Sequence, residues 1–271
     1  MKSGITIILT LYKTPKKRLK ILNQYKKYKV IFFDQNSDGN FKKEIKKILN
    51  FKFKYYASPK NVGLSKASNF LLSKVKTKYC LFTQPDIKIN ETSINILRKA
   101  IQLHKDAIFA GPKFLKKISK FKSSSNYFSY KIVKNLNAAC MLCDTKKLKK
   151  IGFFDEDFFL YWEDIHLMHK VNKTNYKMIL VNNAYALHEF SQSSEDNFKT
   201  RFIRDLNIMY GEFVYDYKVK KVRTLKIFRK LIQNLILFFF NILIFQLKDL
   251  LNNVAKLAGI LKFIKFYFKK F

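Results

Sequence analysis

Short apolar segments alternate with segments of helical periodicity in the first half of this chain, and this alternation restricts the possible folds more than any other feature. Ile5–Leu11 and Tyr79–Thr83 are apolar runs typical of buried parallel strands. Lys16–Lys27 and Ser65–Val75 carry apolar residues at helical spacing. Strands and helices that alternate in this way predict an α/β fold with a doubly wound, mostly parallel sheet.

The same patterns predict further elements along the chain. The remaining strands are expected at 30–33, 51–56, 107–110, 138–142 and 176–181, and the remaining helices at 41–49 and 92–104. Thr14 is expected to cap the helix that begins near Pro15. Segment 113–134 has no clear period, so we expect a long loop or a short edge hairpin there.

Polar residues follow several of the predicted strands. Thr10, Asp34 and Asp86 each stand at or just after a strand end. Ligands of doubly wound sheets bind beyond the carboxyl ends of the strands, so one crevice is expected to hold all three residues. The alternative interpretation is that Asp34 and Asp38 only stabilise a turn, as Asp commonly does.

The segment Ile151–Val171 concentrates acidic residues in a chain that has only 19 of them. Five carboxylates stand here among aromatic residues: Asp155, Glu156, Asp157, Glu163 and Asp164. Apolar surroundings keep a carboxylate basic enough to accept a proton, which favours a catalytic role for the last two. The structural alternative is that this pair only begins a helix, where the helix dipole favours acidic residues.

The net charge of +35, from 54 basic and 19 acidic residues, indicates an anionic partner: nucleic acid, anionic lipid or a phosphorylated substrate. Codon usage in an AT-rich genome would also enrich lysine, so charge alone names no partner.

The cysteines Cys80, Cys140 and Cys143 predict no disulfide framework, and we expect all three to be small buried residues in a reducing cytoplasm. The apolar run near the amino terminus is too short for a signal peptide.

The composition changes from about Lys218 onward, where Asp249 is the sole acidic residue. Leu231–Leu247 is an uncharged run that, as a helix, spans roughly 25 Å and falls short of a hydrocarbon core of about 30 Å. Its polar residues, among them Asn234 and Asn241, fall on one side of the helix, which predicts a basic amphipathic helix at a membrane surface. The alternatives are that this helix packs on the preceding domain or on a second subunit, or that it spans the membrane. The expected domains are residues 1–215 and a tail of residues 216–271.

Six landmarks occur in one order along the chain. They are Thr10-Leu11-Tyr12, Asp34 to Asp38, Asn61-Val62-Gly63 with Asn69, Gln84-Pro85-Asp86, Gly152-Phe153-Phe154-Asp155 with Glu163-Asp164, and His188. In this order they resemble the family 2 glycosyltransferases of GT-A fold, especially the bacterial rhamnosyltransferase-like members. The resemblance covers the chain from Ile5 to about Ser194.

The resemblance implies a role for each landmark. Residues expected to bind the nucleotide sugar are Thr10, Leu11, Tyr12, Asp34, Asn36, Asn61, Gly63, Asn69, Gln84 and Asp86. Asp164 corresponds to the catalytic base, and Glu163 is expected to orient the base or the acceptor hydroxyl. Asp86 and His188 correspond to ligands of a divalent metal, Mg²⁺ or Mn²⁺.

Two departures from the family pattern bear on the metal. The Asp-x-Asp position reads Gln84-Pro85-Asp86, which leaves one carboxylate and puts strict metal dependence in doubt. His166 and His169 share a helix face by their spacing, which makes zinc binding an alternative, although no Cys or further His lies near them in sequence.

The resemblance implies an inverting glycosyltransferase. Its donor would be a nucleotide diphosphate sugar such as dTDP-rhamnose or a UDP-sugar. Its acceptor would be a hydroxyl of a lipid-linked glycan or surface polysaccharide, such as lipopolysaccharide, O-antigen or capsule. The enzyme would be cytoplasmic and bound peripherally to the anionic inner face of the bacterial cytoplasmic membrane. The alternatives are a basic nucleic-acid-binding protein and a catalytically inactive GT-A scaffold. No nucleic-acid-binding motif is present, so no specific nucleic acid is expected. The sugar, nucleotide, acceptor and oligomeric state stay open.

Overall fold

The computed structural model describes residues 4–35, 37, 39–115, 129–189, 193–220 and 222–270. It divides into two compact parts, which are described separately. The first part comprises Met1–Val62, Lys66–Phe154 and Leu167–Glu195, and the second comprises Gly63–Ser65, Asp155–His166 and Asp196–Phe271. Asn36, Asp38 and most of the segment expected as a loop at 113–134 lie outside the described residues.

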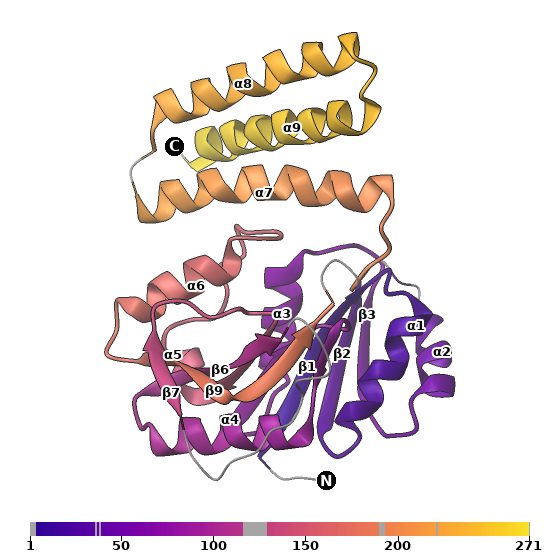
Figure 1. The fold of residues 1–271 in the computed structure, drawn as a ribbon, viewed down its shortest axis with the longest axis vertical. Helices are drawn as coiled ribbons and strands as arrows, with labels where there is room; N and C mark the ends of the chain where they lie inside the picture. Colours follow the sequence, from indigo (N-terminus) through magenta and orange to yellow (C-terminus); the bar gives the residue numbers. More distant parts are fainter. Residues whose placement is uncertain are drawn as a thin grey trace. The chain divides into compact units, whose positions relative to one another are not determined.

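A mixed sheet forms the centre of the first part (Figure 1). Its strands are β1 (Ile5–Tyr12), β2 (Lys29–Gln35), β3 (Lys54–Ser58), β4 (Tyr79–Thr83), β5 (Ile87–Ile89), β6 (Ala107–Leu115), β7 (Tyr130–Val133), β8 (Cys140–Asp144) and β9 (Lys177–His188). The strand order is β3-β2-β1-β4-β8-β6-β9-β5, with β7 paired to β9. Strands β3, β2, β1 and β4 are parallel, whereas β8 runs antiparallel to β4 and begins the mixed half. The predicted α/β class is confirmed.

Helices cover both faces of this sheet. They are α1 (Lys16–Leu19), α2 (Phe41–Ile48), α3 (Leu64–Ser73), α4 (Glu91–Leu103), α5 (Thr145–Lys150) and α6 (Glu163–Asn172). Side chains alternate between the faces along a strand, so Ile7 of β1 joins one core cluster with Leu97 of α4, and Ile8 joins another with Leu71 of α3. This alternation explains why the buried strands read as continuous apolar runs.

The helix expected over residues 16–27 is shorter and tighter than predicted. Only α1 is α-helical, and Lys20–Tyr25 continue as a 3-10 helix. Leu19, Leu22 and Tyr25, spaced by three, are all fully buried, which matches three residues per turn rather than 3.6. The expected cap at Thr14 is wrong, because the helix begins after Pro15 and no side chain caps it.

Strand β9 is twice the length expected from residues 176–181, and β5 was not predicted at all. The first half of β9 pairs with β6 and with β7, the edge strand. Its last residues pair antiparallel with β5, which aligns Ile87 with His188. Between these regions the register shifts: Val181 pairs with Pro112, and Tyr185 pairs with the next residue of β6. The extension carries His188 to a position opposite Ile87, the first residue of β5.

Three helices make up most of the second part: α7 (Phe198–Val219), α8 (Thr224–Leu243) and α9 (Leu247–Lys270). Helix α9 contacts both α7 and α8, and its Ile260 and Phe263 pack with Phe213 and Val214 of α7. The boundary expected between residues 215 and 216 falls inside α7. No helix among the described residues is long and apolar enough to cross a membrane.

Candidate active site

The register of β1 and β2 places the first two landmarks side by side. Leu11 lies opposite Asp34, and Tyr12 lies opposite Gln35, at the carboxyl ends of both strands. Thr10 and Tyr12 have partly exposed side chains, whereas Leu11 is buried in the core. Thr10 and Tyr12, but not Leu11, are therefore exposed for contact with a ligand.

Asp34 is held in place by its neighbours in the sheet. Its side chain is buried, and the Tyr55 hydroxyl on β3 donates a hydrogen bond of 2.5 Å to Asp34 Oδ2. The next residue, Gln35, accepts a hydrogen bond of 3.1 Å at Oε1 from the Val62 backbone N–H. This bond ties the landmark turn at Asn61 to the end of β2. Neither Tyr55 nor Gln35 was predicted to have a role, although the position of Gln35 at the end of a strand is a signal in the sequence.

Asp86 and His188, the expected metal ligands, are brought together by β5 and β9. Asp86 directly precedes β5, His188 ends β9, and Asp86 Oδ2 lies 3.5 Å from His188 Nε2. Asp86 is almost fully buried. Gln84 accepts the turn's hydrogen bond at its backbone oxygen and keeps a partly exposed side chain. The pairing of β5 with β9, which are far apart in the sequence, therefore brings these two donors together.

Glu189 forms an ion-pair group directly beside this pair. Its carboxylate pairs with Arg18 and, at 2.6 Å, with Lys88. Its backbone N–H donates to the carbonyl of Asp86 at 3.1 Å. These bonds fix the chain directly after His188. Neither Arg18 nor Glu189 was predicted to belong to the site, and the position of Glu189 next to His188 is the one signal in the sequence.

The donors at this edge fit a divalent cation that takes part of its coordination from a phosphate. The described residues contain no group of three His, Cys, Asp or Glu side chains able to hold a metal ion. One carboxylate oxygen and one imidazole nitrogen would leave most positions around Mg²⁺ to diphosphate oxygens and water, which is how Mg²⁺ is commonly held. Structural zinc sites need four protein ligands.

Asn69 is engaged with the backbone rather than directed to solvent. Its side-chain amide donates to the Phe154 carbonyl at 2.9 Å, and its Oδ1 accepts from the Phe154 N–H at 3.0 Å. The pair of bonds clamps the segment that leads to the acidic stretch onto α3. The expected role of Asn69 in donor binding stays a prediction.

The carboxylate pair lies in the second part and begins α6. Glu163 is buried, and its Oε2 has no hydrogen-bond partner among the residues that the structure describes. Burial raises the pKa of Glu163 to about 8, and the adjacent Asp164 adds to this increase. Burial also raises the pKa of Asp164, against a hydrogen bond of 2.8 Å from the Ile165 N–H. Asp164 is thus a stronger base than an exposed aspartate.

A pair of strained residues precedes these carboxylates. Tyr161 and Trp162 have φ values of 66° and 70°, in the left-handed region that bulky residues avoid. The Trp162 indole N–H donates to the Ile208 carbonyl of α7 at 3.0 Å, which helps hold this conformation. Backbone strain of this kind is typical of functional sites.

Two further contacts fix the acidic stretch within the second part. Lys218 of α7 lies 2.7 Å from carboxylate oxygens of both Asp155 and Asp157. Gly63 packs so closely on Phe159 that a Cβ at Gly63 would lie 2.5 Å from the Phe159 carbonyl oxygen. The landmark turn and the segment bearing the acid pair are therefore in direct contact.

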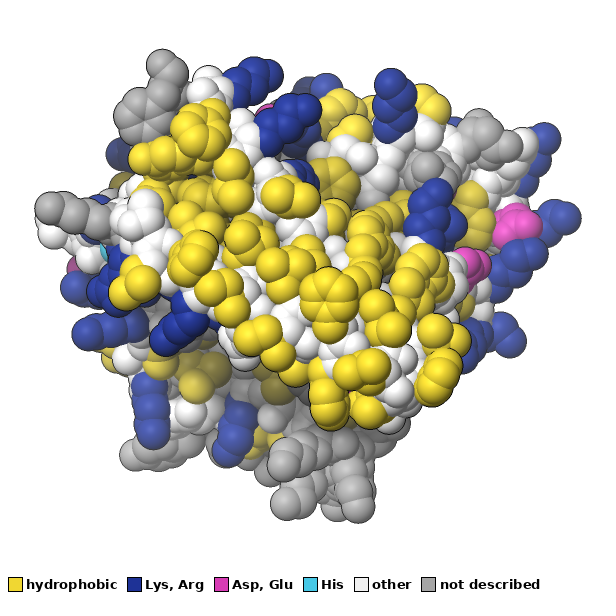
Figure 2. Space-filling model, turned by 90° about the horizontal axis from the view of Figure 1, so that it is seen from above, with side chains coloured by type: hydrophobic (Ala, Val, Ile, Leu, Met, Phe, Trp, Pro, Cys, Tyr) yellow, Lys and Arg dark blue, Asp and Glu magenta, His cyan; other side chains and the backbone are white. Residues whose placement is uncertain are grey.

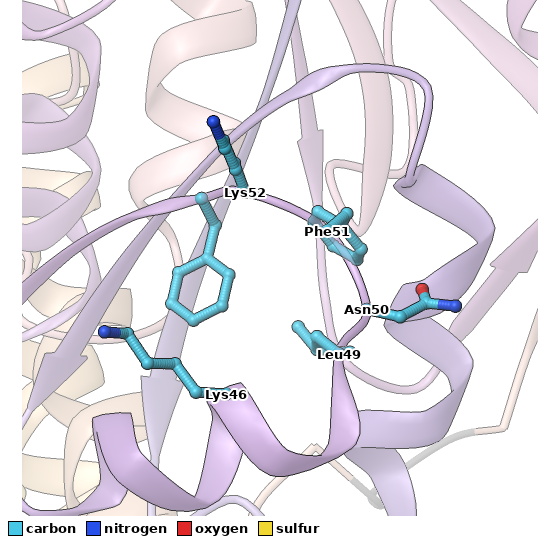
Figure 3. Close-up of a pocket in the computed structure, with 6 residues that line it drawn as sticks. Lys46, Leu49, Asn50, Phe51 and Lys52 are labelled. Carbon is cyan, nitrogen blue, oxygen red and sulfur yellow. The ribbon is translucent and has the colours of Figure 1, made fainter.

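The hollow in Figure 3 is a different place. It has a volume of about 580 Å³ and lies between the end of α2 and the segment before β3. Its lining residues are Lys46, Leu49, Asn50, Phe51, Lys52 and Phe53. None of the expected site residues lines this hollow. It lies at the amino end of β3, whereas the expected site residues that follow strands lie at the carboxyl ends.

Known structures support the fold. A mannosyltransferase from Pyrobaculum calidifontis, PcManGT, in complex with GDP-Man and Mn²⁺, is 13% identical with a TM-score of 0.58 over 98% of this chain and 75% of its own. GalNAc-T7 with UDP, GalNAc and Mn²⁺ is 10% identical with a TM-score of 0.54 over 77% of this chain and 47% of its own. TarS residues 1–349 from S. aureus are 14% identical with a TM-score of 0.53 over 96% of this chain and 91% of their own. The chain spans less than half the length of the first two solved structures it matches, GalNAc-T7 and a longer TarS structure.

No curated protein matches the sequence. The family model described as "Glycosyl transferase family 2" matches residues 16–169, more than half of the chain. The sheet order, the helices on both faces and these neighbours correspond to a GT-A fold. The chain therefore belongs to glycosyl transferase family 2.

Proposed function

We propose that this protein transfers a sugar from a nucleotide diphosphate sugar to a hydroxyl group, with inversion at the anomeric carbon. The observation that carries the proposal is the pairing of Asp86 with His188 at 3.5 Å, in a chain of family 2. A carboxylate and an imidazole at the carboxyl edge of a parallel sheet stand where such folds bind nucleotides. Neighbours of the same fold bind GDP-Man or UDP together with Mn²⁺.

The strand-end residues are proposed to hold the donor. Thr10 and Tyr12 have partly exposed side chains beside Asp34, whose fixed carboxylate suits hydrogen bonding to the base or ribose. Asp86, His188 and the neutral oxygen of Gln84 would hold Mg²⁺ or Mn²⁺ against the diphosphate. When bound, such a metal neutralises charge on the departing diphosphate.

Asp164 is the proposed catalytic base. Its raised pKa makes it more basic than a free aspartate, so it can accept the proton of the acceptor hydroxyl as the new bond to the anomeric carbon forms. Glu163, protonated at neutral pH by its pKa of about 8, can donate a hydrogen bond that orients the neighbouring carboxylate or the acceptor. A single displacement of this kind inverts the anomeric carbon.

The acceptor is proposed to be a lipid-linked or surface-polysaccharide glycan, and residues 216–271 are proposed to bring the enzyme to the cytoplasmic face of a bacterial membrane. The basic composition of this tail supports the proposal, since each Lys or Arg near an anionic membrane contributes about 1 kcal/mol. The first candidates for the donor are dTDP-rhamnose and UDP-sugars. The family match favours a transferase over a nucleic-acid-binding protein.

Two measurements test the proposal. A thermal-shift screen of UDP, GDP and dTDP with and without Mn²⁺ or Mg²⁺ should show stabilisation by one nucleotide, increased by metal. Asp164→Asn should abolish transfer and slow hydrolysis of the donor without acceptor, while leaving the nucleotide shift intact. Full turnover by Asp164→Asn would refute the base assignment, and no donor hydrolysis by the native protein would favour an inactive scaffold.

A further inference from the structure

Helix α8 of the second part turns its apolar side chains outward. Residues more than 60% exposed occur along its length and in the turn that follows it, and six of them define the apolar face of α8: Leu225, Phe228, Ile236, Phe239, Leu243 and Phe245. Figure 2 shows hydrophobic side chains gathered over this helix. Soluble proteins rarely leave a continuous apolar surface of this kind uncovered.

Two polar residues of α8 are on the protein side instead. Asn234 and Asn241 are buried, at 3% and 8% exposure, as is Asn253 of the contacting helix α9. The Asn234 amide donates to the Lys230 carbonyl at 2.8 Å within the helix. Asn234 and Asn241 share the buried side of α8, so the helix is inverted relative to one that buries its apolar face in a protein core. Its apolar face therefore needs an apolar partner.

Exposed basic residues stand before, within and after α8. Between residues 222 and 270 the sequence holds ten Lys and Arg and one acidic residue, Asp249. Arg223 before α8, Arg229 within it and Lys248 after it are exposed. Two copies meeting through such surfaces would bring like charges together, which is unfavourable. An anionic lipid surface complements both the apolar side chains and the basic rim.

We infer that the apolar face of α8 docks on an anionic lipid monolayer, with Phe239, Leu243 and Phe245 among the acyl chains and the basic residues at the headgroups. The inference deepens the proposed function, because it assigns membrane attachment to one surface. It rests on the proposed function only for the reason why the protein attaches, since docking itself requires no enzymatic activity. A helix lying in the interface needs no spanning segment, in agreement with the finding for the described helices.

The test uses the full chain in a vesicle flotation assay. Vesicles of phosphatidylcholine with phosphatidylglycerol are compared with pure phosphatidylcholine, and the double variant Phe239→Ser/Leu243→Ser with the native protein. Leu103→Ser is the matched control, because Leu103 on α4 is similarly exposed, at 70%, but lies outside α8. The double variant is expected to bind the anionic vesicles at least tenfold more weakly, on the order expected for two large apolar side chains. The control is expected to bind as the native protein does. Binding of the native protein should weaken about fivefold for each basic residue that loses its anionic lipid.

Three outcomes would overturn the inference. They are no binding of the native protein to anionic vesicles, equal binding by the double variant, or a dimer in light scattering that the double substitution dissociates without vesicles. Thermal melting of all three proteins checks folding. Donor hydrolysis measured without lipid separates the two proposals. If the native protein hydrolyses no donor, the enzyme assignment is refuted and the vesicle result still stands. If it hydrolyses the donor but does not bind anionic vesicles, the docking inference is refuted and the enzyme assignment still stands.

Discussion

Substitution of Gly63 by alanine tests whether the landmark turn supports the segment that carries the acid pair. Gly63 has a φ of +88°, and a Cβ there would lie 2.5 Å from the Phe159 carbonyl oxygen and 2.8 Å from its Cδ2. The left-handed conformation costs an L-residue roughly 1–2 kcal/mol. The close contact with backbone forces a displacement that costs about 1–3 kcal/mol more.

Gly39 provides a control of the same geometry. Its φ is also +88°, and a Cβ there would meet nothing within 4 Å. Gly39→Ala should therefore lower the free energy of unfolding by the conformational term alone, about 1–2 kcal/mol. Urea denaturation of both variants isolates the contact, because the conformational cost and the change in the unfolded chain are the same in each. We expect Gly63→Ala to be less stable than Gly39→Ala by about 1–3 kcal/mol.

The same pair of variants separates support from stability alone. The Leu64 N–H donates to the Phe159 carbonyl at 2.6 Å, so displacement of Phe159 also moves the strained residues before Glu163. Misplaced catalytic groups cost between about tenfold and a hundredfold in rate. We expect kcat to fall by this factor in Gly63→Ala and to stay near the native value in Gly39→Ala. Equal losses of stability and of kcat in the two variants would refute the reasoning.

Three further predictions concern single side chains. The raised pKa of Glu163, about 8, keeps this carboxyl protonated in the folded state, whereas in the unfolded state it ionises above about pH 4.5. Its contribution to the free energy of unfolding should therefore fall as the pH rises from about 4.5 to 8. Glu163→Gln should remove this decline, a gain of roughly 3 kcal/mol at pH 7 in urea titrations, and an unchanged pH slope would contradict it. Asn69→Leu should lower the free energy of unfolding by about 2 kcal/mol by leaving the Phe154 N–H and carbonyl unpaired, and an unaltered urea midpoint would count against the clamp. Asp86→Ala and His188→Ala should each abolish the extra thermal stabilisation that Mn²⁺ gives in the presence of nucleotide, whereas an undiminished metal effect would exclude them as ligands.

Much of the fold followed from pattern, because buried parallel strands need continuous apolar residues and leave a clear signal. β4 was predicted over its full length, and the acid pair was correctly expected to begin a helix. Polar residues just after strands pointed to the carboxyl edge of the sheet, where Asp34 stands beside β1. Patterns of this kind are local, so they can be read without knowledge of the partners.

The features that were not predicted depend on partners distant in sequence. β5 has three residues and exists only because β9 pairs with it. The bonds of Asn69 join residues 85 positions apart. The burial of Asn234 and Asn241 depends on a partner in the same way: the helical wheel places both on one side of α8, but only packing against α9 decides that this side is buried.

The register shift in the middle of β9 has a consequence for how this family member can change. Val181 and Tyr185 pair with consecutive residues of β6, so three residues of β9 are accommodated as an irregularity upstream of His188. Because side chains alternate along a strand, loss or gain of a single residue there would turn the imidazole to the opposite side of the sheet, away from Asp86. Insertions and deletions that preserve activity are therefore expected to come in pairs at this place.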